Sequence, residues 1–77
     1  MGKHHKNDKL IKAAGTRLRL IREELDMTQE EVWFQRNIVL SGIENGHKNM
    51  TFGTLIELCD LYNISLKEFF KRLGYYD

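Results

Sequence analysis

The fold is decided by the stretch 27–46, which reads MTQEEVWFQRNIVLSGIENG. Thr28 followed by Glu31 is a capping box: the threonine hydroxyl accepts from the backbone N–H of Glu31, and the glutamate side chain accepts from the N–H of Thr28. A helix therefore begins directly after Thr28. The apolar residues that follow fit no single helix face, and no Gly or Pro occurs before Gly42. We place a turn near Asn37 and a third helix after it.

A different outcome is open for the same stretch, namely fusion of the second and third helices into one. Val32, Val39 and Ile43 are spaced by seven and four residues, which keeps them on one helix face. Such a fused helix would separate the remaining helices and invite domain swapping between two chains.

An amphipathic helix precedes this stretch, from about Asp8 to Asp26. Its apolar residues recur at spacings of three and four and mark one face: Ile11, Ala14, Leu18, Ile21 and Leu25. Residues 1–7 show no periodicity, and we interpret them as a flexible basic arm or tag remnant, with a single domain over 8–77. His4 and His5 come without a set of other ligands, so no metal site is predicted.

Two further helices are predicted after the stretch. Thr51 is a good N-cap for one of them, and Ser65 with Glu68 repeats the capping box for the other, which Gly74 ends. Their apolar residues are Phe52, Leu55, Ile56, Leu58, Cys59, Leu61, Tyr62, Leu66, Phe69, Phe70 and Leu73. No segment alternates like a strand. We therefore expect an all-α bundle of about five short helices.

Composition narrows the class of protein. The chain has 77 residues and a net charge of +1, but residues 1–22 hold seven basic side chains against one acidic side chain. This asymmetry suits one positive face turned to phosphate. The longest apolar run is three residues, so no membrane segment is predicted. Cys59 is alone, which excludes an internal disulfide and favours a cytoplasmic location.

Five runs of residues, in order, resemble the lambda-repressor-like Cro/Xre family of helix-turn-helix regulators, and most of all its small restriction–modification controller proteins. The resemblance covers about residues 15–70. The runs are Gly15-Thr16-Arg17-Leu18-Arg19, Met27-Thr28-Gln29-Glu30-Glu31-Val32, Ser41-Gly42-Ile43-Glu44-Asn45-Gly46, Thr54-Leu55-Ile56-Glu57-Leu58-Cys59 and Asn63-Ile64-Ser65-Leu66-Lys67-Glu68-Phe69-Phe70.

This resemblance implies a five-helix fold whose third helix enters the DNA major groove while the second crosses the backbone. It implies phosphate contacts at the start of the second helix and after the third. The implied phosphate-binding residues are Thr28, Gln29, Asn45 and Lys48. It also implies a structural ion pair between Arg22 and Glu44.

The chain departs from the family pattern between Val32 and Glu44, where it is three residues shorter. If the shortening follows Ile38, the residues that normally read bases are missing. If it lies within the second helix, the recognition helix begins at Gln35, Arg36 and Asn37, whose side chains suit guanine and adenine edges. We adopt the second placement, within the second helix. A third possibility is that the three residues were lost through engineering or through an incomplete sequence record. Trp33 also replaces a small residue where two helices should pack closely.

These observations predict a sequence-specific, double-stranded-DNA-binding transcriptional regulator that acts as a homodimer. The expected dimer interface is the last helix and tail, at Phe70, Tyr75 and Tyr76. The alternative is an antitoxin-like or other protein-interaction module that keeps the fold but has lost base reading. No nucleophile–base pair, cofactor motif or small-molecule effector site emerges, so an enzyme is not expected.

Overall fold

The computed structural model describes residues 5–74, which form five helices and contain no strand. The helices are α1 (His5–Glu24), α2 (Gln29–Arg36), α3 (Ser41–Glu44), α4 (Phe52–Leu61) and α5 (Leu66–Leu73). The predicted all-α class is therefore confirmed for the described residues. α1 begins at His5, three residues before the predicted start at Asp8.

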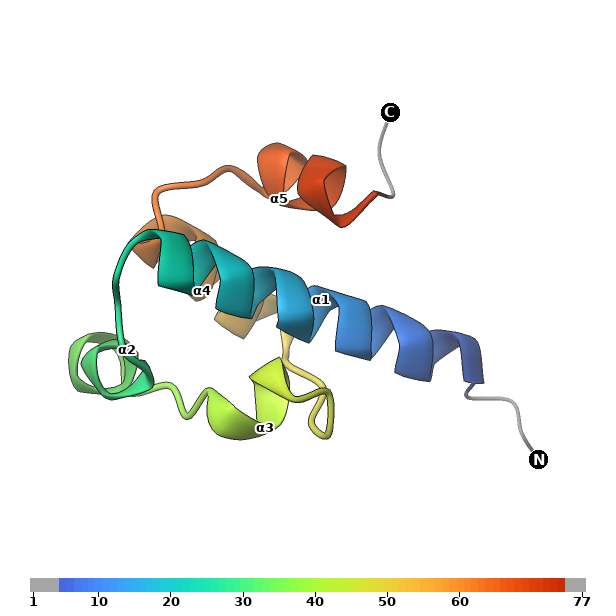
Figure 1. Cartoon of the computed structure of the whole chain (residues 1–77), viewed down its shortest axis with the longest axis horizontal. Helices are drawn as coiled ribbons and strands as arrows, with labels where there is room; N and C mark the ends of the chain where they lie inside the picture. The colour runs from blue at the N-terminus through green and yellow to red at the C-terminus, as the bar shows by residue number, and fades with distance from the viewer. Residues whose placement is uncertain (1–4, 75–77) are drawn as a thin grey trace.

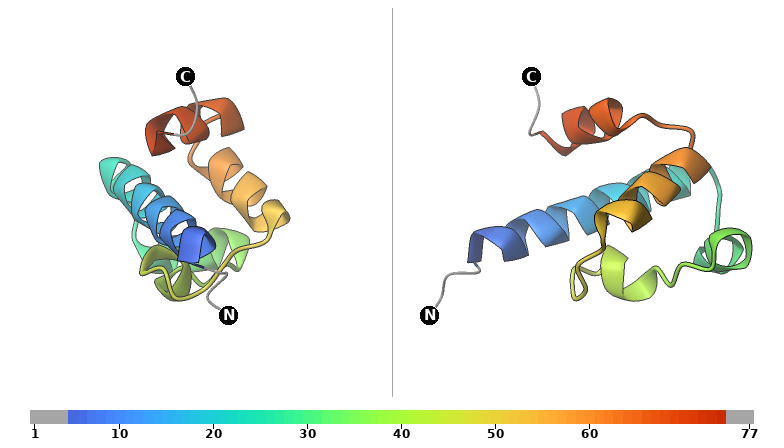
Figure 2. Two further views of the ribbon diagram at one scale, coloured as in Figure 1. Left: turned by 90° about the vertical axis from the view of Figure 1, so that its right-hand side faces the viewer. Right: turned by 180° about the vertical axis from the view of Figure 1, so that it is seen from behind.

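The helices form three layers with α1 in the middle (Figure 1). α5 lies on one side of α1, α2 and α3 lie on the other, and α4 runs beside α1 (Figure 2). α1 contacts both α3 and α5, and α4 contacts α5. The first half of α1 projects beyond α3 (Figure 1).

Side-chain caps start α2, α4 and α5. At α2 the capping box is complete, since Thr28 Oγ1 accepts from the Glu31 N–H at 3.0 Å and the Thr28 N–H donates to Glu31 Oε1 at 2.7 Å. The hydroxyls of Thr51 and Ser65 cap α4 and α5, each accepting from the backbone N–H three residues further on. The helix starts predicted at Thr28, Thr51 and Ser65 are confirmed.

The turn between α2 and α3 is made by Asn37 at the C-cap of α2. Its backbone is left-handed, with φ 59° and ψ 37°, and its N–H donates to the Trp33 carbonyl. Asparagine tolerates this conformation better than most residues because its short polar side chain can hydrogen-bond locally. The turn near Asn37 is confirmed, and fusion of the second and third helices is wrong.

The core draws one large side chain from nearly every segment. Its fully buried members are Leu18, Val32, Leu40, Leu58 and Phe69. Cys59 is buried beside them, and burial raises the pKa of its thiol. A thiol held neutral in an apolar core is a packing group, as the helical pattern indicated.

α1 and α3 cross so closely that the crossing requires a glycine. A Cβ placed on Gly15 would collide with the backbone carbonyl oxygen of Ile43. Backbone atoms cannot step aside as a flexible side chain does, so any larger residue at position 15 must push the two helices apart.

We predict that Gly15→Ala lowers the free energy of unfolding by about 1–3 kcal/mol, because of this overpacking. Gly53→Ala is the matched control, since a Cβ there meets nothing nearer than Thr51 Oγ1 at 3.8 Å. The control should raise the free energy of unfolding by about 0.5–1 kcal/mol through helix propensity. Urea denaturation compares the two, and a shift of the same sign in both variants would contradict the close crossing.

Candidate nucleic-acid interface

A buried ion pair joins the end of α1 to the end of α3. Arg22 Nε donates to Glu44 Oε2 at 2.8 Å, and Arg22 Nη2 donates to Glu44 Oε1 at 2.9 Å. Arg22 is 8% exposed and Glu44 is 5% exposed. The predicted structural pair is therefore confirmed, and it has the bidentate geometry that suits a guanidinium and a carboxylate.

Two further contacts extend this pair toward α2. The remaining guanidinium nitrogen, Arg22 Nη1, donates to the Met27 carbonyl at 2.7 Å, just before the N-cap of α2. The Gln29 side-chain amide donates to Glu44 Oε1 at 2.8 Å. Hydrogen bonding to Glu44 raises the pKa of Arg22 above its usual value, so the guanidinium stays charged. One network thus ties together α1, the start of α2 and the end of α3.

Tyr62 is a buried titratable residue close to this network. Burial raises the pKa of its hydroxyl well above its ordinary value, and the Glu44 carboxylate raises it further. The hydroxyl therefore stays neutral. Its oxygen is buried without a hydrogen-bond partner among the described residues.

The four predicted phosphate contacts lie at the two ends of the α2–α3 unit. The Thr28 hydroxyl is engaged in the capping box, and Gln29 uses one amide N–H on Glu44. Asn45 and Lys48 are both exposed, directly after α3. Asn45 Oδ1 accepts from the His47 N–H at 3.1 Å, so its side-chain N–H groups keep their hydrogens for an outside acceptor.

A lysine that the sequence pattern did not single out joins this end of α3. A Cβ at Gly46 would collide with the Lys12 side chain, which shows how tightly α1 approaches the loop after α3. Gly46 has a φ of 81°, which allows this close approach. Lys12 and Lys48 are both exposed, and the Lys48 side chain lies against Gly42, toward the start of α3.

The predicted base-reading residues lie elsewhere than expected. Gln35 and Arg36 are the last two residues of α2 and Asn37 is its C-cap, so their placement at the start of the third helix is wrong. The physical reason is that Asn37 ends α2 with a left-handed backbone, and the chain does not become helical again until Ser41. Arg36 donates to two acidic residues of α4, to Glu57 Oε1 at 2.6 Å and to Asp60 Oδ2 at 2.9 Å. These hydrogen bonds raise the pKa of Arg36.

The expectation that Trp33 lies where two helices pack closely is also wrong. α2 turns Val32 into the core, and the adjacent Trp33 and Phe34 face outward with 52% and 85% exposure. Val39, in the connection to α3, is 60% exposed. An exposed pair of consecutive aromatic residues is the surface feature that sequence periodicity missed.

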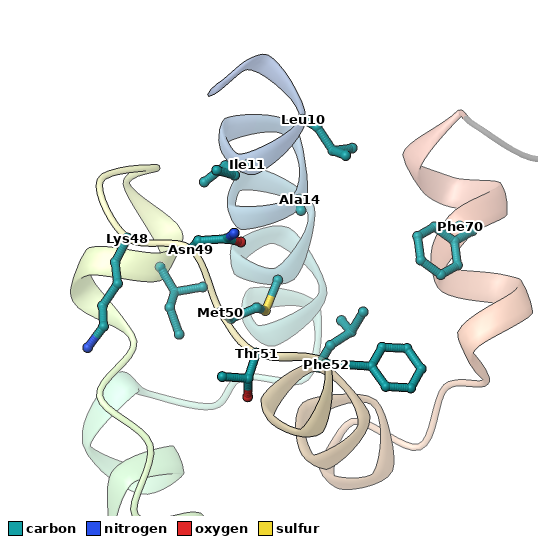
Figure 3. A pocket seen from close by; sticks show the side chains of 11 residues that line it. Leu10, Ile11, Ala14, Lys48, Asn49, Met50, Thr51, Phe52 and Phe70 are labelled. Atoms are coloured by element: carbon teal, nitrogen blue, oxygen red, sulfur yellow. The ribbon is translucent and has the colours of Figure 1, made fainter. Parts of the chain in front are cut away.

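A second apolar surface is a groove of about 280 Å³ between the first half of α1, the loop before α4, the start of α4, and α5. Leu10 and Phe70 point toward each other across it, with Phe52 at its edge (Figure 3). Lys48 lines the same groove, but its amine points away from the opening (Figure 3). Phe70 is half-buried and packs edge-to-face on Phe69, with ring centroids 5.4 Å apart. Tyr75 and Tyr76, the other predicted interface residues, lie outside the described residues.

Within residues 5–74, no group of three or more His, Cys, Asp or Glu side chains is arranged to hold a metal ion. The helices in this part of the chain are too short or too polar to span a membrane. Comparisons with protein-family models, with curated proteins and with solved structures found no match.

We predict that Glu44→Ala costs about 3–5 kcal/mol of folding free energy, because it leaves the Arg22 guanidinium buried without its carboxylate. The double variant Arg22→Met with Glu44→Leu should be more stable than Glu44→Ala. Arg19→Ala is the control, because Arg19 pairs with Glu23 at 3.3 Å on the surface, where such a pair contributes about 0.3–0.5 kcal/mol. Chemical denaturation measures all three, and equal stability of Glu44→Ala and the parent would show that the pair is not structural.

Proposed function

We propose that this chain is a double-stranded-DNA-binding transcriptional regulator of the helix-turn-helix kind, similar to the lambda-repressor-like Cro/Xre proteins, and that it acts as a homodimer. The observation that carries this proposal is the buried network of Arg22, Glu44 and Gln29. It holds the start of α2 and the end of α3 in one rigid unit. That unit lies on the side of α1 opposite α5 (Figure 1).

The two ends of this unit supply donors for phosphate. The start of α2 offers backbone N–H groups and the second amide hydrogen of Gln29, with the positive end of the helix dipole behind them. The loop after α3 offers the amide of Asn45 and the exposed Lys48, whose side chain lies against Gly42; Lys12 of α1 lies against Gly46 of the same loop. Backbone contacts of this sort position a protein on a duplex and supply most of its salt-dependent affinity.

Under this proposal, the shortened α3 is the helix that contacts the bases. α2 keeps its full length and α3 begins only at Ser41, which favours a shortening after Ile38 and removes part of the usual reading surface. Val39 and Ser41 are the exposed residues at the start of α3. A serine hydroxyl accepts or donates at several bases and an apolar side chain suits a thymine methyl, so we expect weak discrimination among sequences.

The second candidate, a protein-interaction module on the same fold, is favoured by two specific observations. The arginine expected to read guanine is occupied by Glu57 and Asp60 of its own chain. The helix that would cross the DNA backbone instead exposes Trp33 and Phe34 beside Glu30 and Glu31. Apolar and acidic side chains of this kind suit a protein surface better than a phosphate backbone.

We predict that Lys48→Ala weakens binding to all duplexes alike and makes the slope of log affinity against log salt shallower by about one unit. Lys71→Ala on α5 is the control, and it should leave the slope unchanged. Arg36→Ala should leave base preference unchanged, because Arg36 is paired with α4. Fluorescence anisotropy with labelled duplexes at several salt concentrations measures all three variants. If the parent binds no duplex at low salt, the DNA proposal fails and the interaction module takes its place.

A further inference from the structure

The outer face of α2 carries two aromatic side chains and two carboxylates side by side. Trp33 and Phe34 are 52% and 85% exposed, and Glu30 and Glu31 are exposed next to them. All four line one shallow hollow on the surface. We propose that this α2 outer face, defined by these four residues, binds an arginine-bearing segment of a different protein. The inference goes beyond DNA binding and does not depend on it.

Helix geometry brings one carboxylate of this surface within reach of both rings. Trp33 and Phe34 follow Glu30 by three and four residues, and side chains at these spacings are neighbours on a helix surface. Val32 of the same helix is fully buried, so the stripe of Glu30, Trp33 and Phe34 faces away from the core. A side chain that lies across this stripe therefore contacts two aromatic rings and a carboxylate at once.

A cation is the group that suits both the rings and the carboxylates. The faces of aromatic rings attract cations, and carboxylates pair with them. A purely apolar partner would cover the carboxylates and remove their water without replacing its hydrogen bonds. Arginine suits the α2 outer face better than lysine, because its planar guanidinium stacks on an aromatic ring and donates two parallel hydrogen bonds to a carboxylate.

Both carboxylates of the α2 outer face have oxygens left for such a partner. Glu31 uses its Oε1 on the Thr28 N–H. Glu30 takes part in none of the side-chain hydrogen bonds or ion pairs among residues 5–74. Arg36, the basic residue of α2, is bonded to two carboxylates of α4. The negative charge of the α2 outer face is therefore not neutralised by its own helix, and it attracts a basic partner.

A second copy of this chain is a poor source of the arginine. The chain has five arginines, all within the described residues, and four of them are bonded to carboxylates of the same chain: Arg19, Arg22, Arg36 and Arg72. The fifth, Arg17, is half-buried. A paired arginine would have to give up a bond within its own chain to make one between two copies, so little affinity would be gained. The partner is therefore a different protein with a basic contact segment.

Tryptophan fluorescence tests the proposal directly, because Trp33 is the only tryptophan of the chain. The full chain is titrated with a short peptide that alternates arginine and leucine, and with matched peptides that carry lysine or glutamate in place of arginine. We expect a saturable change in Trp33 emission with the arginine peptide, weaker binding of the lysine peptide and no binding of the glutamate peptide.

Variants of the chain show whether the peptide binds at the α2 outer face. Glu30→Gln and Phe34→Ser should each weaken binding of the arginine peptide about two- to fivefold. Both residues are exposed, so both variants should keep the helical circular dichroism of the parent. Asp8→Asn is the matched control, since it removes an exposed charge from the first turn of α1, and it should leave the affinity unchanged.

Four outcomes would overturn the proposal. The first is no saturable change in Trp33 emission with the arginine peptide, and the second is equally tight binding of the lysine peptide. The third is an equal effect on affinity of Asp8→Asn and of either variant of α2, which would mean that no site on α2 is involved. The fourth is a change in emission with protein concentration when no peptide is present, which would identify a second copy as the occupant.

Discussion

The bidentate ion pair between Arg22 and Glu44 is the interaction on which the arrangement of α1, α2 and α3 depends. α3 has only four residues and no side-chain cap, far below the length at which a helix persists by itself in water. Its position therefore comes from contacts with the rest of the chain. Ile43 and Glu44 are buried, and Gly15 lets the α1 backbone approach close enough for the arginine of the same helix to reach the carboxylate. Gln29 then uses that carboxylate to anchor the start of α2.

Local signals in the sequence predicted where the helices begin better than they predicted which side chains of different helices contact each other. The capping hydroxyls of Thr28, Thr51 and Ser65 each act through an N–H three residues away, so they can be recognised in any sequence window. The Arg22–Glu44 pair spans 22 residues and was expected only through the family resemblance. Arg36 was misplaced because its partners lie 21 and 24 residues away on α4, and no local pattern reveals which face α2 turns toward them.

The orientation of α2 about its own axis determines which of its side chains are exposed, and so bears on both candidate functions. Turning Val32 inward and Arg36 toward α4 leaves Trp33 and Phe34 in solvent. Lys48 meanwhile lies against Gly42 of α3, and Lys12 lies against Gly46 in the loop that follows. The outer face of α2 thus exposes aromatic side chains beside Glu30 and Glu31. Under the proposed DNA-binding function, a shortened α3 would place more weight on contacts to the DNA backbone than on base edges, because few exposed side chains remain to distinguish sequences.

Native-state hydrogen exchange tests most directly whether the buried network holds α3 in place. The amides of Glu44 and Asn45 donate to the carbonyls of Leu40 and Ser41 within α3. If the Arg22 pair holds this helix, these amides should exchange with the same free energy of opening as core amides of α1 such as that of Leu18, because α3 opens only when the fold does. Exchange of Glu44 and Asn45 at the rate of fraying helix ends, with Leu18 fully protected, would contradict the account.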